Sequence, residues 1–157
     1  MPGIWALLFV PSVVLALTVM TTTRSAEGAG PEADQEAPKL APCPDSPNCV
    51  SSDAPEGSHF VAPFVIEGSP EKAWSIVLQT LSNWPRTEVV LEEPTLVRVE
   101  CRSAWLRFVD DLELQLRAED GIIAVRSASR VGYSDFGVNR KRVETLRQAL
   151  EVAGVVR

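Results

Sequence analysis

A net-basic run near the C-terminus contains the residues best suited to chemistry. The stretch Arg126–Arg147, RSASRVGYSDFGVNRKRVETLR, carries six cations and two carboxylates, although the 157-residue chain has a formal net charge of -6. Arginines, hydroxyl groups and the free N–H groups at a helix start are groups that bind anions. We therefore take this run as a candidate binding site. Its nine candidate residues are Arg126, Ser129, Arg130, Tyr133, Ser134, Asp135, Asn139, Arg140 and Arg142.

The same run also fits an internal clamp. The cations of Arg140–Arg142 fall in the opening turns of an expected helix, where they oppose the positive end of the helix dipole. These positive charges could be offset within the protein, with Asp135 as the acceptor for Arg130 or Arg140 and Glu144 one turn beyond Arg140. They could instead be offset by a bound anion. The residues alone leave both open.

Catalytic chemistry has weaker support in the sequence. A hydrolase could use Ser129 or Ser134 with His59 or Asp135, and a thiol enzyme could use Cys49. The chain, however, has one histidine and no G-x-S-x-G motif. We therefore expect no catalytic residue and no cofactor, and an enzyme is the alternative hypothesis.

Three cysteines, Cys43, Cys49 and Cys101, allow at most one internal disulfide. The turn-forming segment CPDSPNCVSS predicts a bridge between Cys43 and Cys49, which would stabilise the fold by roughly 2 kcal/mol. Two thiols at this spacing lack the second ligand pair of a zinc site, so no metal is expected. Cys101 falls on the apolar side of an expected strand and is predicted to be a buried thiol, although a bridge to either other cysteine stays open.

The N-terminal part predicts export. Ile4–Met20 is 17 residues without a charge, so residues 1–25 are interpreted as a signal peptide or an N-terminal membrane anchor. Residues 26–42, rich in Ala, Pro and Glu, are predicted to be a flexible linker, and residues 43–157 a single domain. The expected location is periplasmic, or membrane-anchored on the extracytoplasmic side. The acidic composition argues against a nucleic-acid partner.

The hydrophobic periodicity predicts an α+β domain. Ser69 and Pro70 begin a helix that ends before Pro85, and a second helix is predicted at Asn139–Ala153. Apolar and charged residues then alternate with a period of two, which is typical of an antiparallel sheet with one buried face. The expected fold has two layers, a four- to five-stranded antiparallel sheet packed by two helices in the order β-α-β-β-β-β-α. Its strands are His59–Ile66, Thr87–Glu92, Leu96–Arg102, Phe108–Arg117 and Ile122–Ser129.

Two motifs together resemble a known family. CPDSPNCVSS near the start of the expected domain and RSASRVGYSDFGVNRKRVETLR near its end are similar to the family catalogued as domain of unknown function number 1499. The resemblance covers roughly Cys43 to Leu150 and implies an envelope or lumenal protein. It implies no activity, cofactor or catalytic residue.

The expected function is that of a non-catalytic cell-envelope module. It would bind an anionic or amphipathic small ligand, or an envelope protein partner, through the basic loop, with membrane association through the N-terminal segment. The alternatives are a hydrolase or thiol enzyme of unknown substrate and a purely structural or assembly protein.

Overall fold

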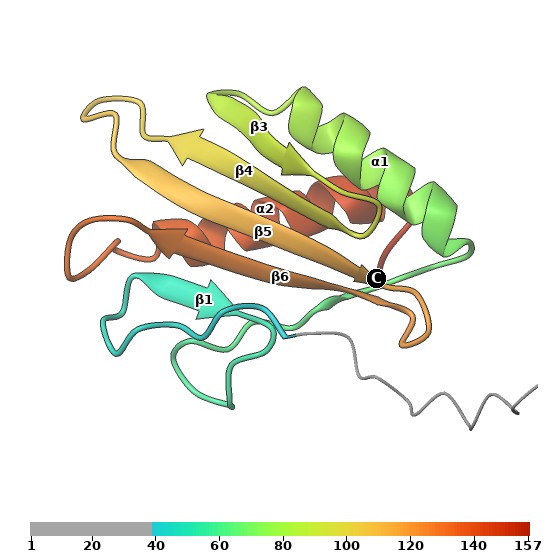
Figure 1. The fold of residues 1–157 in the computed structure, drawn as a ribbon, viewed down its shortest axis with the longest axis horizontal. Coiled ribbons are helices and arrows are strands. Elements are labelled where there is room, and N and C mark those ends of the chain that lie inside the picture. Colours follow the sequence, from blue (N-terminus) through green and yellow to red (C-terminus); the bar gives the residue numbers. More distant parts are fainter. Residues whose placement is uncertain (1–38) are drawn as a thin grey trace, which may run out of the picture. The chain divides into compact units, whose positions relative to one another are not determined.

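A sheet covered on one face by two helices forms the core of the molecule (Figure 1). The computed structural model describes residues 39–157, which belong to one compact unit. The predicted signal peptide or anchor, residues 1–25, and residues 26–38 of the predicted linker lie outside the described residues. Leu40, inside that predicted linker, is buried and its backbone N–H donates to Asp53, so the domain's contacts begin before Cys43.

Six strands form the sheet, and every pairing is antiparallel. The spatial order is β1-β6-β5-β4-β3, with β2 pairing β6 beyond β1's part of that strand. The last four strands form a meander joined by short loops, and their antiparallel pairing agrees with the alternating pattern of the sequence. The strands are β1 (Cys49–Ser51), β2 (Phe64–Val65), β3 (Thr87–Glu92), β4 (Leu96–Arg102), β5 (Val109–Arg117) and β6 (Ile122–Ser129).

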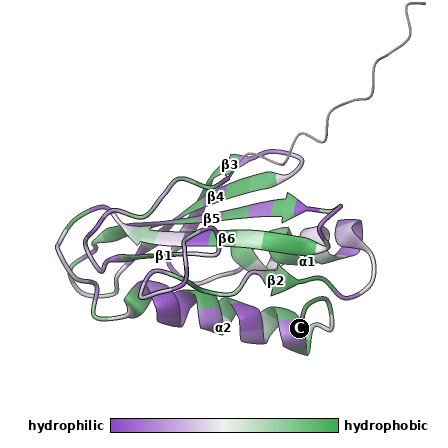
Figure 2. Ribbon diagram, turned by 90° about the horizontal axis from the view of Figure 1, so that it is seen from below, coloured by the Kyte–Doolittle hydropathy of each residue, from purple (hydrophilic) through white to green (hydrophobic). Residues whose placement is uncertain are grey.

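Helices α1 (Pro70–Ser82) and α2 (Val138–Val152) pack on the same face of this sheet (Figure 2). Each supplies one apolar stripe to the core, and the alternate residues of β4, β5 and β6 supply the other half. In the described residues neither helix is long and apolar enough to cross a membrane. The predicted two-layer α+β class and element order are confirmed.

The prediction was less accurate for the N-terminal strands. The expected strand His59–Ile66 is reduced to two residues, β2, and the cysteine motif contributes a short strand of its own, β1. Pro63 lacks the N–H that would continue a ladder, which limits β2 to the residues after it. The sheet therefore has six strands rather than four or five.

The two helix starts differ in how they are capped. Ser69 caps α1 as predicted, because its Oγ accepts from the Lys72 N–H at 3.3 Å. At α2 the N-cap is Gly137, in the left-handed conformation with φ of 80°. Glycine adopts this conformation without steric cost, so the chain can turn sharply from the loop into the helix.

Candidate functional site

The structure distributes the nine predicted site residues over several environments. One group is buried beneath α2, a second lies on the open face of the sheet, and a third is exposed at a loop tip, while Asp135 binds the start of α2 and Arg140 contacts the Ser58 carbonyl. The predicted run is therefore continuous in sequence but does not form a single site in space.

A buried polar cluster, which we call the clamp, joins the start of α2 to the sheet. Asn139 is fully buried, and its Oδ1 accepts from the Ser127 hydroxyl at 2.6 Å and from the Arg142 guanidinium. Arg142 also donates to Ser127 and forms an ion pair with Asp110, whose side chain is 8% exposed. Burial leaves these groups no water to replace a lost partner, so every member depends on the others.

The clamp extends to the cysteine motif. The Asn139 side-chain amide donates to the Asn48 carbonyl and to the Ser129 hydroxyl, both at 2.9 Å. Asn48 in turn donates to the Gly132 carbonyl at 2.6 Å. The loop closed by the Cys43–Cys49 disulfide is thus bound, through Asn48, to Asn139 and to the loop that precedes α2. The disulfide predicted from the turn-forming spacing is present.

The carboxylates predicted to pair with the basic loop have other partners. Asp135 accepts from the backbone N–H groups of Gly137 and Asn139, so it serves the start of α2 rather than Arg130 or Arg140. Glu144 pairs with Arg147 at 3.0 Å, not with Arg140. The prediction that Asp135 pairs with Arg130 or Arg140, and that Glu144 lies beside Arg140 as its partner, was therefore wrong. The cause is that backbone N–H groups at the helix start lie closer to Asp135 than any guanidinium.

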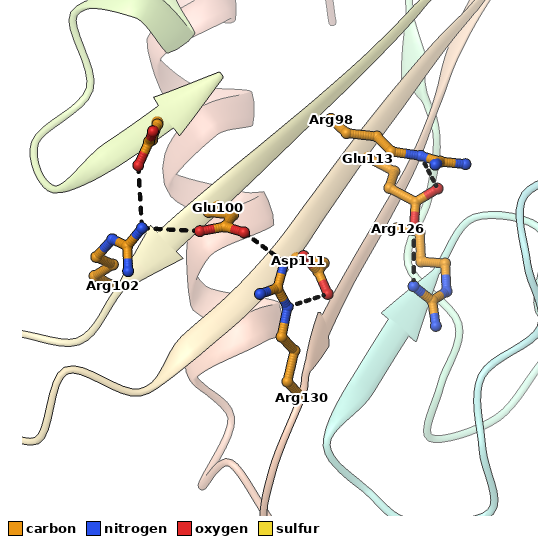
Figure 3. Close-up of polar contacts among 8 residues, drawn as sticks. Arg98, Glu100, Arg102, Asp111, Glu113, Arg126 and Arg130 are labelled. Carbon is orange, nitrogen blue, oxygen red and sulfur yellow. Dashed lines mark hydrogen bonds and ion pairs between the residues drawn. The ribbon is translucent and has the colours of Figure 1, made fainter. Parts of the chain in front are cut away.

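Arg126 and Arg130 belong to two separate ion-pair groups on the open face of the sheet, which together we call the lattice (Figure 3). Arg130 pairs with Glu100 and Asp111, both at 2.7 Å, and these acids raise the pKa of Arg130. A separate group has Glu113 between Arg98 and Arg126. The Arg126 Nε is the buried side-chain nitrogen or oxygen without a hydrogen-bond partner among residues 39–157. The charged side chains of the lattice therefore pair mainly with one another.

Arg140 also has an internal partner, because its guanidinium donates to the Ser58 carbonyl at 2.8 Å. Tyr133 and Ser134, by contrast, are exposed at the tip of the loop between β6 and α2. The Ser134 hydroxyl accepts from the Phe136 N–H, a local turn contact.

Three loops meet at one end of the sheet, which we call the loop end: residues 83–86, 103–108 and 130–137. The ladder places them together, because Cys101 pairs with both Thr87 and Asp110, and Asp110 pairs with Ser129. In Figure 1 the latter two loops project from the left end of the sheet. Large apolar side chains are exposed on them: Trp105 at 94%, Leu106, Phe108, Val131, Tyr133 and Phe136 at 97%.

A pocket of about 530 Å³ lies beside the disulfide and is lined by residues 39–43, 51 and 53–59. Of its two carboxylates, that of Asp53 is already engaged, because it accepts two hydrogen bonds from Arg117 at 2.9 and 2.6 Å. Burial raises the pKa of Asp53, but the bonds from Arg117 and Leu40 outweigh it and the net shift of that pKa is downward.

The groups named for the enzyme hypothesis are held by structural contacts. His59 hydrogen-bonds through Nδ1 to the Cys49 carbonyl, and Ser129 accepts from Asn139. Cys49 is in the disulfide, and Cys101 is a buried free thiol whose pKa burial raises. In residues 39–157 no three His, Cys, Asp or Glu side chains are grouped to hold a metal ion.

The comparison with family models gave one match, and it covers most of the described residues. The model for "Protein of unknown function (DUF1499)" matches residues 39–150. The chain belongs to this family. Comparison with curated proteins and with solved structures gave no match.

The clamp explains why the two motifs of this DUF1499 member occur together. Asn48 lies in CPDSPNCVSS, and Ser129, Gly132, Asn139 and Arg142 lie in the basic run, so the hydrogen bonds described above join the two segments. The residue separation across the Asn139–Asn48 bond is 91. Three of the nine predicted site residues, Ser129, Asn139 and Arg142, therefore belong to the clamp that joins these two segments.

Sequence reasoning missed two sets of residues. The first is Asn48, Asp110 and Ser127 of the clamp. For Asp110 and Ser127 a signal was present, since each is a polar residue at a core-facing position of an alternating strand. The second set is Trp105 and Phe136, whose signal was a large apolar side chain in a loop.

Proposed function

We propose that this DUF1499 protein is a non-catalytic module of the cell envelope that binds an anionic amphipathic ligand through its loop end. The observation that supports it is the combination of exposed apolar side chains with cations that have no acidic partner. Trp105, Leu106 and Phe136 are largely exposed at the same end of the sheet, and exposed apolar side chains that gather in one region often mark an interaction site.

The binding surface differs from the one expected from the sequence. Arg126, Arg130, Arg140 and Arg142 all have partners inside the protein. Recruiting them to a ligand would require breaking those contacts. The residues of the loop end itself, outside the clamp and the lattice, are therefore the better binding groups.

An extracytoplasmic location is part of the proposal. The apolar N-terminal segment of the sequence supports export, and a disulfide between Cys43 and Cys49 persists in oxidising compartments. The enzyme alternative has less support, because His59 contacts a backbone carbonyl and Cys49 is oxidised. A purely structural role fits the clamp but leaves the exposed tips without a purpose.

The test is a titration of the full chain with monomeric lysophosphatidylglycerol, followed by backbone amide chemical shifts. We expect shifts at residues 103–108 and 130–137 and none at the opposite end of the sheet. Replacing Arg86→Gln together with Lys141→Gln should weaken binding by about fivefold per cation, since each contributes about 1 kcal/mol near an anionic group.

A matched control removes two exposed cations from elsewhere. Lys72→Gln with Arg157→Gln changes the net charge equally and should leave the affinity unchanged. Equal weakening by both pairs would reduce the effect to net charge, and an absence of shifts at the loop end would reject the proposed function. Shifts confined to residues 51–59 would move the site to the pocket beside the disulfide.

A further inference from the structure

The two apolar tips of the loop end lie on different loops. Trp105 and Leu106 occupy the turn between β4 and β5, which closes through hydrogen bonds between Ser103 and Phe108. Phe136 occupies the loop between β6 and α2. Exposures of 94% and 97% for Trp105 and Phe136 show that neither side chain is covered by its own loop.

The backbone of the loop end adopts, at three positions, a left-handed conformation that residues other than glycine rarely adopt. Among residues 39–157 three non-glycine residues have positive φ, namely Arg86 at 57°, Arg107 at 54° and Phe136 at 53°. All three lie in the loop end. Left-handed backbone at non-glycine residues has a cost and often marks functional positions.

Three cations in or next to the loop end form no ion pair with an acid of the described residues. Arg86, Arg107 and Lys141 are exposed, and none forms an ion pair within the part of the chain that the structure describes. The three loops of the loop end carry three arginines and one acid, Asp135, which is bound to the start of α2. The opposite end is acidic: its loops 66–69, 93–95 and 118–121 carry four acids and no Lys or Arg.

From this arrangement we propose that the loop end docks on the surface of an anionic phospholipid bilayer. The proposal deepens the proposed function and rests on it. Trp105, Leu106 and Phe136 enter the headgroup region, while Arg86, Arg107 and Lys141 contact lipid phosphates. Aromatic side chains with adjacent cations are the chemistry that favours such an interface.

A bilayer suits this surface better than a protein groove or an enclosed small molecule. The apolar side chains stand on separate tips, and none of Trp105, Leu106 and Phe136 lines the pocket beside the disulfide or the pocket between residues 83–85 and the two helices. A bilayer is a deformable partner that accepts protruding side chains without a matching cavity. The charge difference between the two ends sets the orientation, because an anionic surface attracts the loop end and repels the acidic end.

The experiment places a polarity-sensitive fluorophore at each end of the sheet in the full chain. Leu106→Cys labels the loop end, and Asp120→Cys labels the acidic end; Cys101 is buried and the other cysteines are bridged. With equimolar phosphatidylglycerol and phosphatidylcholine vesicles, we expect a blue shift and quenching by brominated lipids at position 106 and neither at position 120. Because the fluorescence reports the surroundings of each label, the comparison of the two positions does not depend on membrane association through the N-terminal segment.

Companion variants separate the contributions. Phe136→Ser in the 106-labelled chain should lower the inserted fraction by about tenfold, the value for losing the burial of a large apolar side chain. The matched control is Val152→Ser, which removes an apolar side chain that is 90% exposed on the far end of α2. Arg86→Gln with Lys141→Gln should lower insertion by about fivefold per cation, and phosphatidylcholine vesicles should abolish it.

If the fluorophore at position 106 shows no blue shift and no quenching with any of the vesicles, the inference is wrong. Equal insertion at positions 106 and 120 would also overturn it. A change at position 106 that follows protein concentration without vesicles would assign the tips to a second copy of the chain and also overturn it. If lysophosphatidylglycerol still changes the amide chemical shifts of the loop end in these cases, the proposed function is retained. If neither lipid form binds, both fail.

Discussion

Arg142 and Arg130 come from one basic run and have opposite roles. The Arg142 side chain is 13% exposed and is bonded to Asp110, Ser127 and Asn139 under α2. The Arg130 side chain is 46% exposed and pairs with two acids on the open face of the sheet. Water can replace the partners of Arg130 but not those of Arg142. Burial, rather than residue type or local charge, therefore decides which arginine holds the fold.

The largest effect should come from the clamp. Asn139→Ala removes hydrogen bonds to Ser127, Arg142, Asn48 and Ser129 and leaves their polar groups buried without partners. We expect the free energy of unfolding to fall by about 3 kcal/mol, measured by urea denaturation. The matched control is Asn83→Ala at the exposed end of α1, which should cost less than about 0.5 kcal/mol. Equal effects of the two would show that the clamp does not stabilise the fold.

The next largest loss of stability should come from removing the Cys43–Cys49 disulfide, which closes the loop that carries Asn48. Replacing both Cys43 and Cys49 by serine should cost roughly 2 kcal/mol, because the closed loop restricts the unfolded chain. Reductant should lower the urea midpoint of the natural chain and leave that of the double variant unchanged. A further drop in the double variant would point to Cys101, the remaining thiol.

The fold could be predicted from the sequence wherever the pattern was local. Alternation placed β3, β4 and β6 at the residues where they occur, and Ser69 and Pro70 fixed the start of α1. The two- and three-residue strands β1 and β2 are too short to show a period. They exist because β6 offers an edge for pairing, and that depends on tertiary structure.

The candidate site could be predicted only in part, because its contacts are long-range. The sequence showed a basic run that could either pair internally or bind an anion. No local rule, however, assigns Asn139 to Asn48 or Arg130 to Glu100, which are 91 and 30 residues apart. The same local charge pattern is therefore compatible with a clamp, a lattice or a ligand site, and only the fold distinguishes them.

The Asp53–Arg117 pair, with side chains 9% and 10% exposed, is about as buried as the Arg142–Asp110 pair. Since the pKa of Asp53 is lowered by folding, the pair stabilises the protein above the ordinary carboxyl pKa, and this contribution is lost as pH falls through the folded-state pKa. Asp53→Asn should cost about 1 to 2 kcal/mol at pH 7. The difference between the two proteins should shrink below about pH 4, the range of carboxyl titration. Urea denaturation as a function of pH measures it, and a constant difference would contradict the linkage.

The smallest effect should come from Arg130. Arg130→Ala removes two ion pairs, but Glu100 keeps its bond to Arg102 and Asp111 becomes hydrated, so the urea midpoint should barely move. Any residual difference should vanish at about 1 M salt, where exposed pairs are screened. Arg98→Ala, which disrupts the other group on the open face, should behave alike. If Arg130→Ala instead destabilised the protein as much as Asn139→Ala, the open face would be as dependent on its ion pairs as the buried clamp, and burial would no longer explain the difference between the two arginines.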